Sequence, residues 1–216
     1  MENGITELVF ILDRSGSMEG LEGDTIGGYN AMLARQKSSS GEAVMTTVLF
    51  DDRYELLHDR ANIKDVEPIT ERAYYARGGT ALLDAVGRTI SKIGNAQKHT
   101  SPKYRADKTV FVITTDGMEN ASREYSASKV RSMVERQKER YGWEFIFLGA
   151  NIDAVATAEQ FGIDADRAAN YHADGVGTLL HHKVVSEAIL NIRERGVMPK
   201  DWASRIDEDY RRRSRK

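Results

Sequence analysis

The run Val9-Phe10-Ile11-Leu12 passes directly into Asp13 and then into a turn rich in glycine and serine, and few folds accommodate such a segment. Four consecutive apolar residues, two of them β-branched, predict a strand that is buried on both faces, as in a parallel sheet. A helical pattern follows the turn. A buried strand followed by a helix is the repeating unit of an α/β sheet, in which ligands bind at the carboxyl ends of the strands.

The remaining chain repeats this alternation. Further strands are expected at residues 43–50, 109–115, 143–148 and 168–172, and helices at 19–37, 82–93, 126–141 and 180–192. The short turn at Asp51 and Asp52 permits only a hairpin, so residues 54–58 should form an antiparallel edge strand. Right-handed crossovers then predict a doubly wound, mostly parallel central sheet with helices on both faces. In this order the strands that end at Asp13 and Thr115 become neighbours.

Length and composition limit the class of protein. The 216 residues suffice for one sizeable α/β domain, which we expect at residues 1–196, followed by a polar C-terminal extension at 197–216. The net charge of −2 predicts neither a nucleic acid nor an acidic membrane as a partner. Cysteine is absent, no apolar run approaches the ~20 residues of a membrane span, and the residues before the first strand leave no room for a signal peptide. These features predict a cytoplasmic protein.

Hydroxyl and carboxylate side chains follow two of the predicted strands. Asp13, Ser15 and Ser17 occupy alternate positions, so in an extended loop their oxygens can face one point. Such an all-oxygen set suits Mg²⁺ or Mn²⁺ better than zinc. Asp116 ends the strand at 109–115 and faces the same edge of the sheet as Asp13. Thr80 follows two glycines and precedes a helix, and by itself it fits a helix cap.

Taken together, Asp13-x-Ser15-x-Ser17, Gly78-Gly79-Thr80 and the strand that ends at Asp116 resemble the metal-ion-dependent adhesion site (MIDAS) of von Willebrand factor type A (VWA) domains of the bacterial stand-alone type. All five MIDAS positions match. The resemblance implies a Rossmann-like fold and a site for Mg²⁺ or Mn²⁺, with Ca²⁺ as a further candidate. It also implies that the two serines bind the cation directly, while Thr80 and the acids exchange between direct and water-mediated contact. An acidic side chain of a partner protein would complete the shell.

Two other functions are weighed against this non-catalytic protein-binding module. A phosphatase of the haloacid-dehalogenase type would use Asp13 as its nucleophile. Such enzymes place a second Asp two residues later, where this chain has Ser15. They also need a Lys at a position near Asp116 where this chain has none. A structural subunit with a vestigial metal site is the other alternative. We expect no catalytic residues. The sequence indicates no oligomeric state.

Several polar and apolar residues near the motifs have two interpretations each. Asp51 and Asp52 are expected to be turn residues rather than ligands. Glu119 and Asn120 either hold the metal loop or are exposed, and Met18 and Met118 either form an apolar rim or belong to the core. The five histidines show no zinc-ligand pattern. The basic tail at residues 210–216 is expected to be a solvated terminus rather than a nucleic-acid site.

Overall fold

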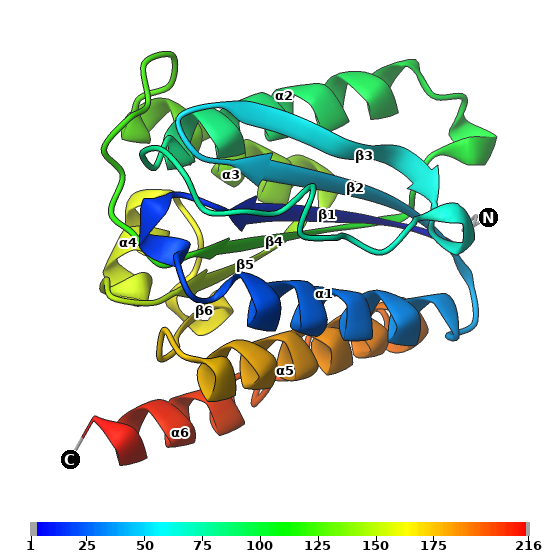
Figure 1. Ribbon diagram of the computed structural model, residues 1–216. Coiled ribbons are helices and arrows are strands. Elements are labelled where there is room, and N and C mark those ends of the chain that lie inside the picture. The colour runs from blue at the N-terminus through cyan, green and yellow to red at the C-terminus, as the bar shows by residue number, and fades with distance from the viewer. Residues whose placement is uncertain (1–3, 215–216) are drawn as a thin grey trace.

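A computed structural model describes residues 4–214 of the chain. Its centre is a six-stranded sheet in the order β3-β2-β1-β4-β5-β6 (Figure 1). The strands are β1 (Ile5–Asp13), β2 (Glu42–Phe50), β3 (Tyr54–Asn62), β4 (Lys108–Thr115), β5 (Glu144–Gly149) and β6 (Ala168–Asn170). The helices are α1 (Glu22–Lys37), α2 (Leu82–His99), α3 (Ala127–Tyr141), α4 (Ala154–Gln160), α5 (Gly175–Arg195) and α6 (Ser204–Arg213).

The predicted fold class is confirmed. All strand pairs are parallel except β2–β3, which is antiparallel and forms one edge of the sheet. The edge strand β3 extends to Asn62, four residues beyond its expected end at 58, because it continues to pair with β2 past an irregularity in the register. The first helix begins at Glu22 rather than at 19, since a 3₁₀ turn at Gly16–Met18 precedes it.

Two apolar cores lie on opposite faces of the sheet. Leu8, Phe10 and Leu12 of β1 point into the core beneath α1 and α5, whereas Val9 and Ile11 point into the core beneath α2, α3 and α4. Strand side chains alternate between faces, so the central strand has to be apolar at every position to fill both cores. Figure 1 shows the resulting three layers, with α1 and α5 on one side of the sheet and α2 and α3 on the other.

The segment after residue 196 packs onto the domain. Met198, Trp202, Ala203 and Ile206 are buried and belong to the core on the α5 side, and the indole N–H of Trp202 donates to the carbonyl of Asp166 at 2.8 Å. The domain boundary at 196 stays a prediction, but the described part of the expected polar extension contributes to the core. Two residues of the basic tail, 215 and 216, lie outside the described residues. Within residues 4–214 no helix is long and apolar enough to cross a membrane.

Candidate metal centre

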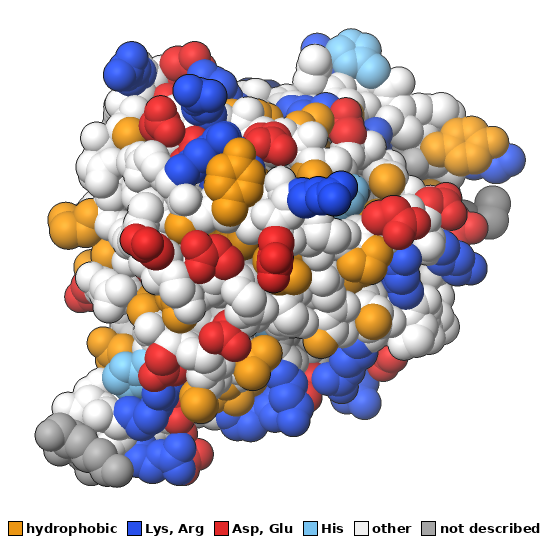
Figure 2. Space-filling model, viewed as in Figure 1, with side chains coloured by type: hydrophobic (Ala, Val, Ile, Leu, Met, Phe, Trp, Pro, Cys, Tyr) orange, Lys and Arg blue, Asp and Glu red, His pale blue; other side chains and the backbone are white. Residues whose placement is uncertain are grey.

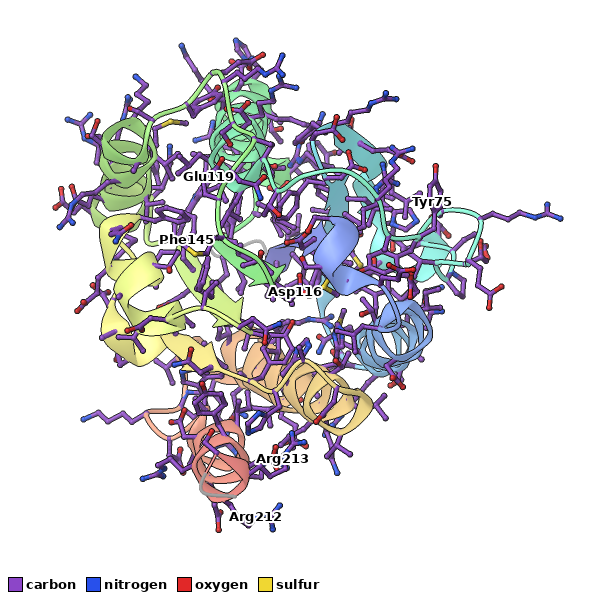
Figure 3. All side chains as sticks on the ribbon, turned by 60° about the vertical axis from the view of Figure 1, so that its left-hand side comes forward. Tyr75, Asp116, Glu119, Phe145, Arg212 and Arg213 are labelled. Atoms are coloured by element: carbon purple, nitrogen blue, oxygen red, sulfur yellow. The ribbon has the colours of Figure 1, made fainter. Side chains whose placement is uncertain are left out.

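The expected ligands sit where the two central strands end. β1 and β4 are parallel neighbours, with Leu12 opposite Thr114, so Asp13 and Asp116 emerge at the same edge. The chain runs from β1 to β2 and β3 on one side and then returns to β4 on the other, which makes this edge the point where the strand order reverses. Figure 3 shows Asp116 near the middle of this edge, in front of the strand ends. The predicted adjacency of the two strands is confirmed.

Three loops bring five oxygen-bearing side chains together at this point. The Ser17 hydroxyl donates to Asp116 Oδ1 at 2.5 Å, and the Oγ atoms of Ser15 and Ser17 are 3.1 Å apart. Thr80 joins them from the loop before α2, because a methyl group added at Gly117 would lie 3.1 Å from both Thr80 Oγ1 and Ser17 Oγ. The same methyl would lie 3.9 Å from Ser15 Oγ. The absence of a side chain at Gly117 therefore leaves a space that is lined by three hydroxyls.

Asp13 is fixed at the rear of this cluster. Its Oδ1 accepts from the backbone N–H of Ser15 at 2.7 Å, and its Oδ2 accepts from the hydroxyl of Thr115 at 2.5 Å. Asp13, Ser15, Thr80 and Asp116 are each at most 3% exposed, whereas Ser17 is exposed. The cluster is thus buried at the strand ends and reaches solvent through exposed residues of its loops, which include Ser17 and Gly78.

The donor set fits a small divalent cation. Asp116 Oδ2 is buried, and no partner for it is found among residues 4–214. No lysine or arginine in this part of the chain hydrogen-bonds to, or pairs with, Asp13 or Asp116. Two buried carboxylates without a compensating cation are unfavourable, and a hard cation with oxygen ligands would compensate both. No group of three or more His, Cys, Asp or Glu side chains suited to a metal occurs among the described residues, so any ion here would depend on the hydroxyls.

The loop after Asp116 holds Thr80 in place. The backbone N–H of Thr80 donates to Asn120 Oδ1 at 2.8 Å, and the N–H of Asn120 donates back to the Thr80 carbonyl at 3.0 Å. Glu119 accepts from the N–H of Leu83 at 2.8 Å and so satisfies the first turn of α2. The N-cap position itself is Ala81, so Thr80 is not the helix cap that its isolated sequence context suggested. Glu119 and Asn120 thus both hydrogen-bond to the segment that carries Thr80 and the start of α2, although Asn120 is itself exposed.

Arg14 is a structural residue of the site that the sequence did not reveal. Arg14 lies between the motif residues Asp13 and Ser15 in the sequence, and its side chain is fully buried. Its guanidinium donates to Asp51 Oδ2 at 2.9 Å, to Glu55 at 2.7 Å and to the Ala73 carbonyl at 3.1 Å. Arg14 therefore ties the first metal loop to the β2–β3 turn and to the segment that leads to Thr80.

Asp51 is the acid at the centre of this network. It is a turn residue, as expected, and it accepts from Arg77 Nε at 2.7 Å as well as from Arg14. Burial raises the pKa of Asp51, but hydrogen bonds from Arg77, the backbone of Arg53 and Arg14 outweigh it, so the pKa is lowered overall. Asp51 is therefore an ionised partner of arginines rather than a further metal ligand.

The two methionines next to the motifs differ in exposure. Met18 is buried in the core, whereas Met118 is 74% exposed on the loop that follows Asp116. Only Met118 can act as an apolar rim beside the open side of the cluster. The sequence alone did not separate the two, because each methionine lies within two residues of an expected ligand, Ser17 or Asp116.

Stabilisation by Mg²⁺ is expected to increase as the pH rises. Burial, with a smaller contribution from Asp116, raises the pKa of Asp13 from 3.8 to about 6 against the hydrogen bonds from Thr115 and Ser15. Burial also raises the pKa of Asp116. Protons thus compete with the cation, and the Mg²⁺-induced increase in Tm should be small near about pH 5 and reach a plateau above about pH 7. Thermal unfolding with Mg²⁺ and with chelator across this range measures it, and a pH-independent increase would contradict it.

Comparisons with known proteins show which solved structures share the fold of this chain. No protein-family model matches the chain, and no curated protein matches it. The solved structure of the vWF domain of the type V pili tip protein Mfa5 from Porphyromonas gingivalis is similar, with a TM-score of 0.65 and 11% identity over 90% of this chain and 98% of that one. The von Willebrand factor type A structure from Catenulispora acidiphila gives a TM-score of 0.60 and 14% identity over 86% of this chain and 42% of that one.

Proximal thread matrix protein 1 from the mussel byssus is also similar, with a TM-score of 0.58 and 13% identity over 89% of this chain. This chain spans 47% of the length of that protein. Another structure of it, with a TM-score of 0.57 and 16% identity, is described as having a zinc-occupied MIDAS motif. At these identities the likeness concerns the fold.

Proposed function

From the von Willebrand factor type A fold of this chain and the cluster at its sheet edge, we propose that the protein is a metal-ion-dependent protein-binding module. Asp13, Ser15, Ser17, Thr80 and Asp116 would hold the cation, for which Mg²⁺ or Mn²⁺ is preferred and Ca²⁺ is a further candidate. The observation that carries the proposal is the buried, unpartnered Oδ2 of Asp116 beside three converging hydroxyls. The zinc in one similar structure shows that a site of this type can accept a divalent metal in that protein.

An acidic side chain of a partner protein would complete the shell of the cation. Two ionised carboxylates would neutralise one divalent cation, so an acid from outside would bind through a coordination position left open on the cation rather than through an excess of positive charge. Ser17 and Met118 are exposed on the loops that form the cluster. The partner is therefore expected to present its carboxylate beside an apolar side chain that contacts Met118.

The arrangement of charges favours binding over catalysis. The position where a phosphatase of the haloacid-dehalogenase type has its acid/base is Ser15, and no lysine in the described chain pairs with Asp116. Similar structures include a pilus adhesin and the vWF domain of a pili tip protein. A vestigial site is disfavoured because all five oxygen donors remain in place.

Affinity capture tests this function. The immobilised protein is expected to retain a partner from a lysate of its source organism in Mn²⁺ and to release it in chelator. Asp13→Ala should abolish capture, and so should Gly117→Ala, whose methyl would occupy the space between the hydroxyls of Ser17 and Thr80. Gly27→Ala is the matched control, because nothing lies within 4 Å of a methyl added there.

Capture that persists in chelator, or that Gly117→Ala leaves intact, would contradict the proposal. When a captured partner is identified, replacing its candidate acid by the amide should reproduce the effect of the chelator. Loss of capture after this replacement would identify the acid as the partner residue that binds the metal.

A further inference from the structure

A groove runs between α2 and α3 on the opposite side of the sheet from α1 and α5. It has a volume of about 640 Å³, and none of the five expected metal ligands lines it. Its walls come from α2, α3 and the connection that follows α2, and its floor includes Trp143, which directly precedes β5. A volume of this size accommodates a few apolar side chains of a ligand or a small molecule.

The floor of the groove is apolar and aromatic. Ile90 and Trp143 are buried beneath it, and Met133 is half-buried beside them. A methyl added at Gly94 would make ordinary contacts, 3.9 Å from the Trp143 ring and 3.6 Å from Gln137 Nε2, so this position borders the floor of the groove. Tyr141 stands 56% exposed at one end. Apolar side chains of a ligand would gain most of their contacts on this floor.

Every charged side chain that lines the groove is basic. These residues are Lys98, Arg105, Lys129 and Arg136, and no Asp or Glu is among the lining residues. Within residues 4–214, Lys98, Lys129 and Arg136 form no ion pair with an acid. The chain as a whole carries a net charge of −2, and Figure 2 shows acidic and basic side chains interspersed over another face. The groove is therefore a local exception to the charge balance of the surface.

The positive charges are distributed along the groove. Lys129 lies in the first turn of α3, and Arg136 lies seven residues later, about 10 Å along the axis. Lys98 is in the last turn of α2, on the opposite wall. A mononucleotide carries its negative charges together at one end, whereas a peptide can space carboxylates along its length. The spacing therefore favours a peptide with acidic residues between its apolar ones.

We propose that the groove between α2 and α3 is a second binding site, which accepts an acidic, amphipathic segment of a partner protein. Apolar side chains of the segment would pack on Ile90, Met133 and Trp143, and its carboxylates would pair with Lys98, Lys129 and Arg136. This site does not depend on the metal centre. Removal of the metal should leave it intact.

A helical probe peptide of about 15 residues, with leucines on one face and glutamates flanking them, tests the site. Amide resonances of the ¹⁵N-labelled full chain should shift in α2 and α3, and fluorescence anisotropy should give an affinity that falls as salt is added. Lys129→Glu/Arg136→Glu should weaken binding by about tenfold or more, because like charges then face the glutamates. Lys64→Glu/Lys183→Glu is the matched control, with the same change of net charge at exposed residues outside the groove.

The outcomes separate this site from other ligands and from the metal centre. A peptide with glutamines in place of the glutamates should bind at least about tenfold more weakly. Chelator and Asp13→Ala should change the affinity of the glutamate peptide less than about twofold. Equal weakening in both double variants, shifts outside α2 and α3, or tighter binding of ATP or of oligothymidylate than of the peptide would overturn the proposal.

Discussion

Replacing Arg14 by alanine is expected to lower the free energy of unfolding by about 3–5 kcal/mol. The Arg14 side chain is 1% exposed and that of Asp51 is fully buried, so the substitution leaves the Asp51 carboxylate inside the protein with Arg77 as its remaining ionic partner. It also removes the donor to Glu55 and to the Ala73 carbonyl and leaves a cavity. For a chain of this length, Tm should fall on the order of 10 °C. Urea unfolding and thermal melts measure both quantities.

Arg88→Ala is the matched control for this effect. Arg88 pairs with Glu124, and these two side chains are 40% and 55% exposed. An exposed pair of this kind contributes less than about 1 kcal/mol. Arg14→Lys should recover part of the loss, because it keeps the charge beside Asp51 and loses the other donors. If Arg14→Ala destabilised the protein no more than Arg88→Ala, the network would not be holding the loops of the metal centre together.

Asp13→Asn is expected to have opposite effects with and without a divalent cation. Burial raises the pKa of Asp13 from 3.8 to about 6. A group with a raised pKa contributes full stability below its unfolded value, and this stability is lost as the pH rises through the folded value. Above about pH 7 the metal-free wild type therefore carries the whole cost of the ionised acid, about 3 kcal/mol from the size of the pKa change. The uncharged asparagine avoids this cost, so the variant should be more stable than the wild type in chelator.

With Mg²⁺ present the order should reverse. The cation compensates the Asp13 charge in the wild type and raises its stability, whereas the variant lacks the carboxylate and should respond little. Asp59→Asn is a control, since Asp59 lies on the exposed edge strand and pairs with Lys92 at 2.8 Å. If the variant is less stable than the wild type in chelator, the charge of Asp13 does not destabilise the metal-free protein.

The fold could be predicted because it depends on local patterns, whereas the convergence of Thr80 with the two strand-end loops was implied by the family resemblance. Apolar runs that end in an acid or a glycine turn locate β1 and β4, and crossover rules then make them neighbours. Nothing local marks Arg14 as buried, because its partners Asp51 and Glu55 lie 37 and 41 residues away. An arginine in a polar loop is normally exposed. The support of Thr80 by Asn120 likewise joins residues that are 40 positions apart.

The spacing of apolar residues in the C-terminal segment indicated a buried helix face, but the polar composition of the segment concealed it. Trp202, Ile206 and Tyr210 recur every four residues, which is the spacing of one helix face. In the structure Trp202 and Ile206 are buried, and the ring of Tyr210 stacks on His172 with centroids 4.7 Å apart. Three arginines near the end of this helix made the segment look like a solvated tail. The cytoplasmic location depends on no such contact and stays a prediction.

We expect oxygen atoms from three loops that are distant in the sequence to hold one divalent cation. The most direct measurement is thermal unfolding of the wild type and of Asp13→Asn above about pH 7, each with Mg²⁺ and with chelator. We expect Mg²⁺ to raise the Tm of the wild type by several degrees and to leave that of the variant unchanged. Equal melting curves of the wild type with Mg²⁺ and with chelator, or an equal rise in both proteins, would contradict the claim.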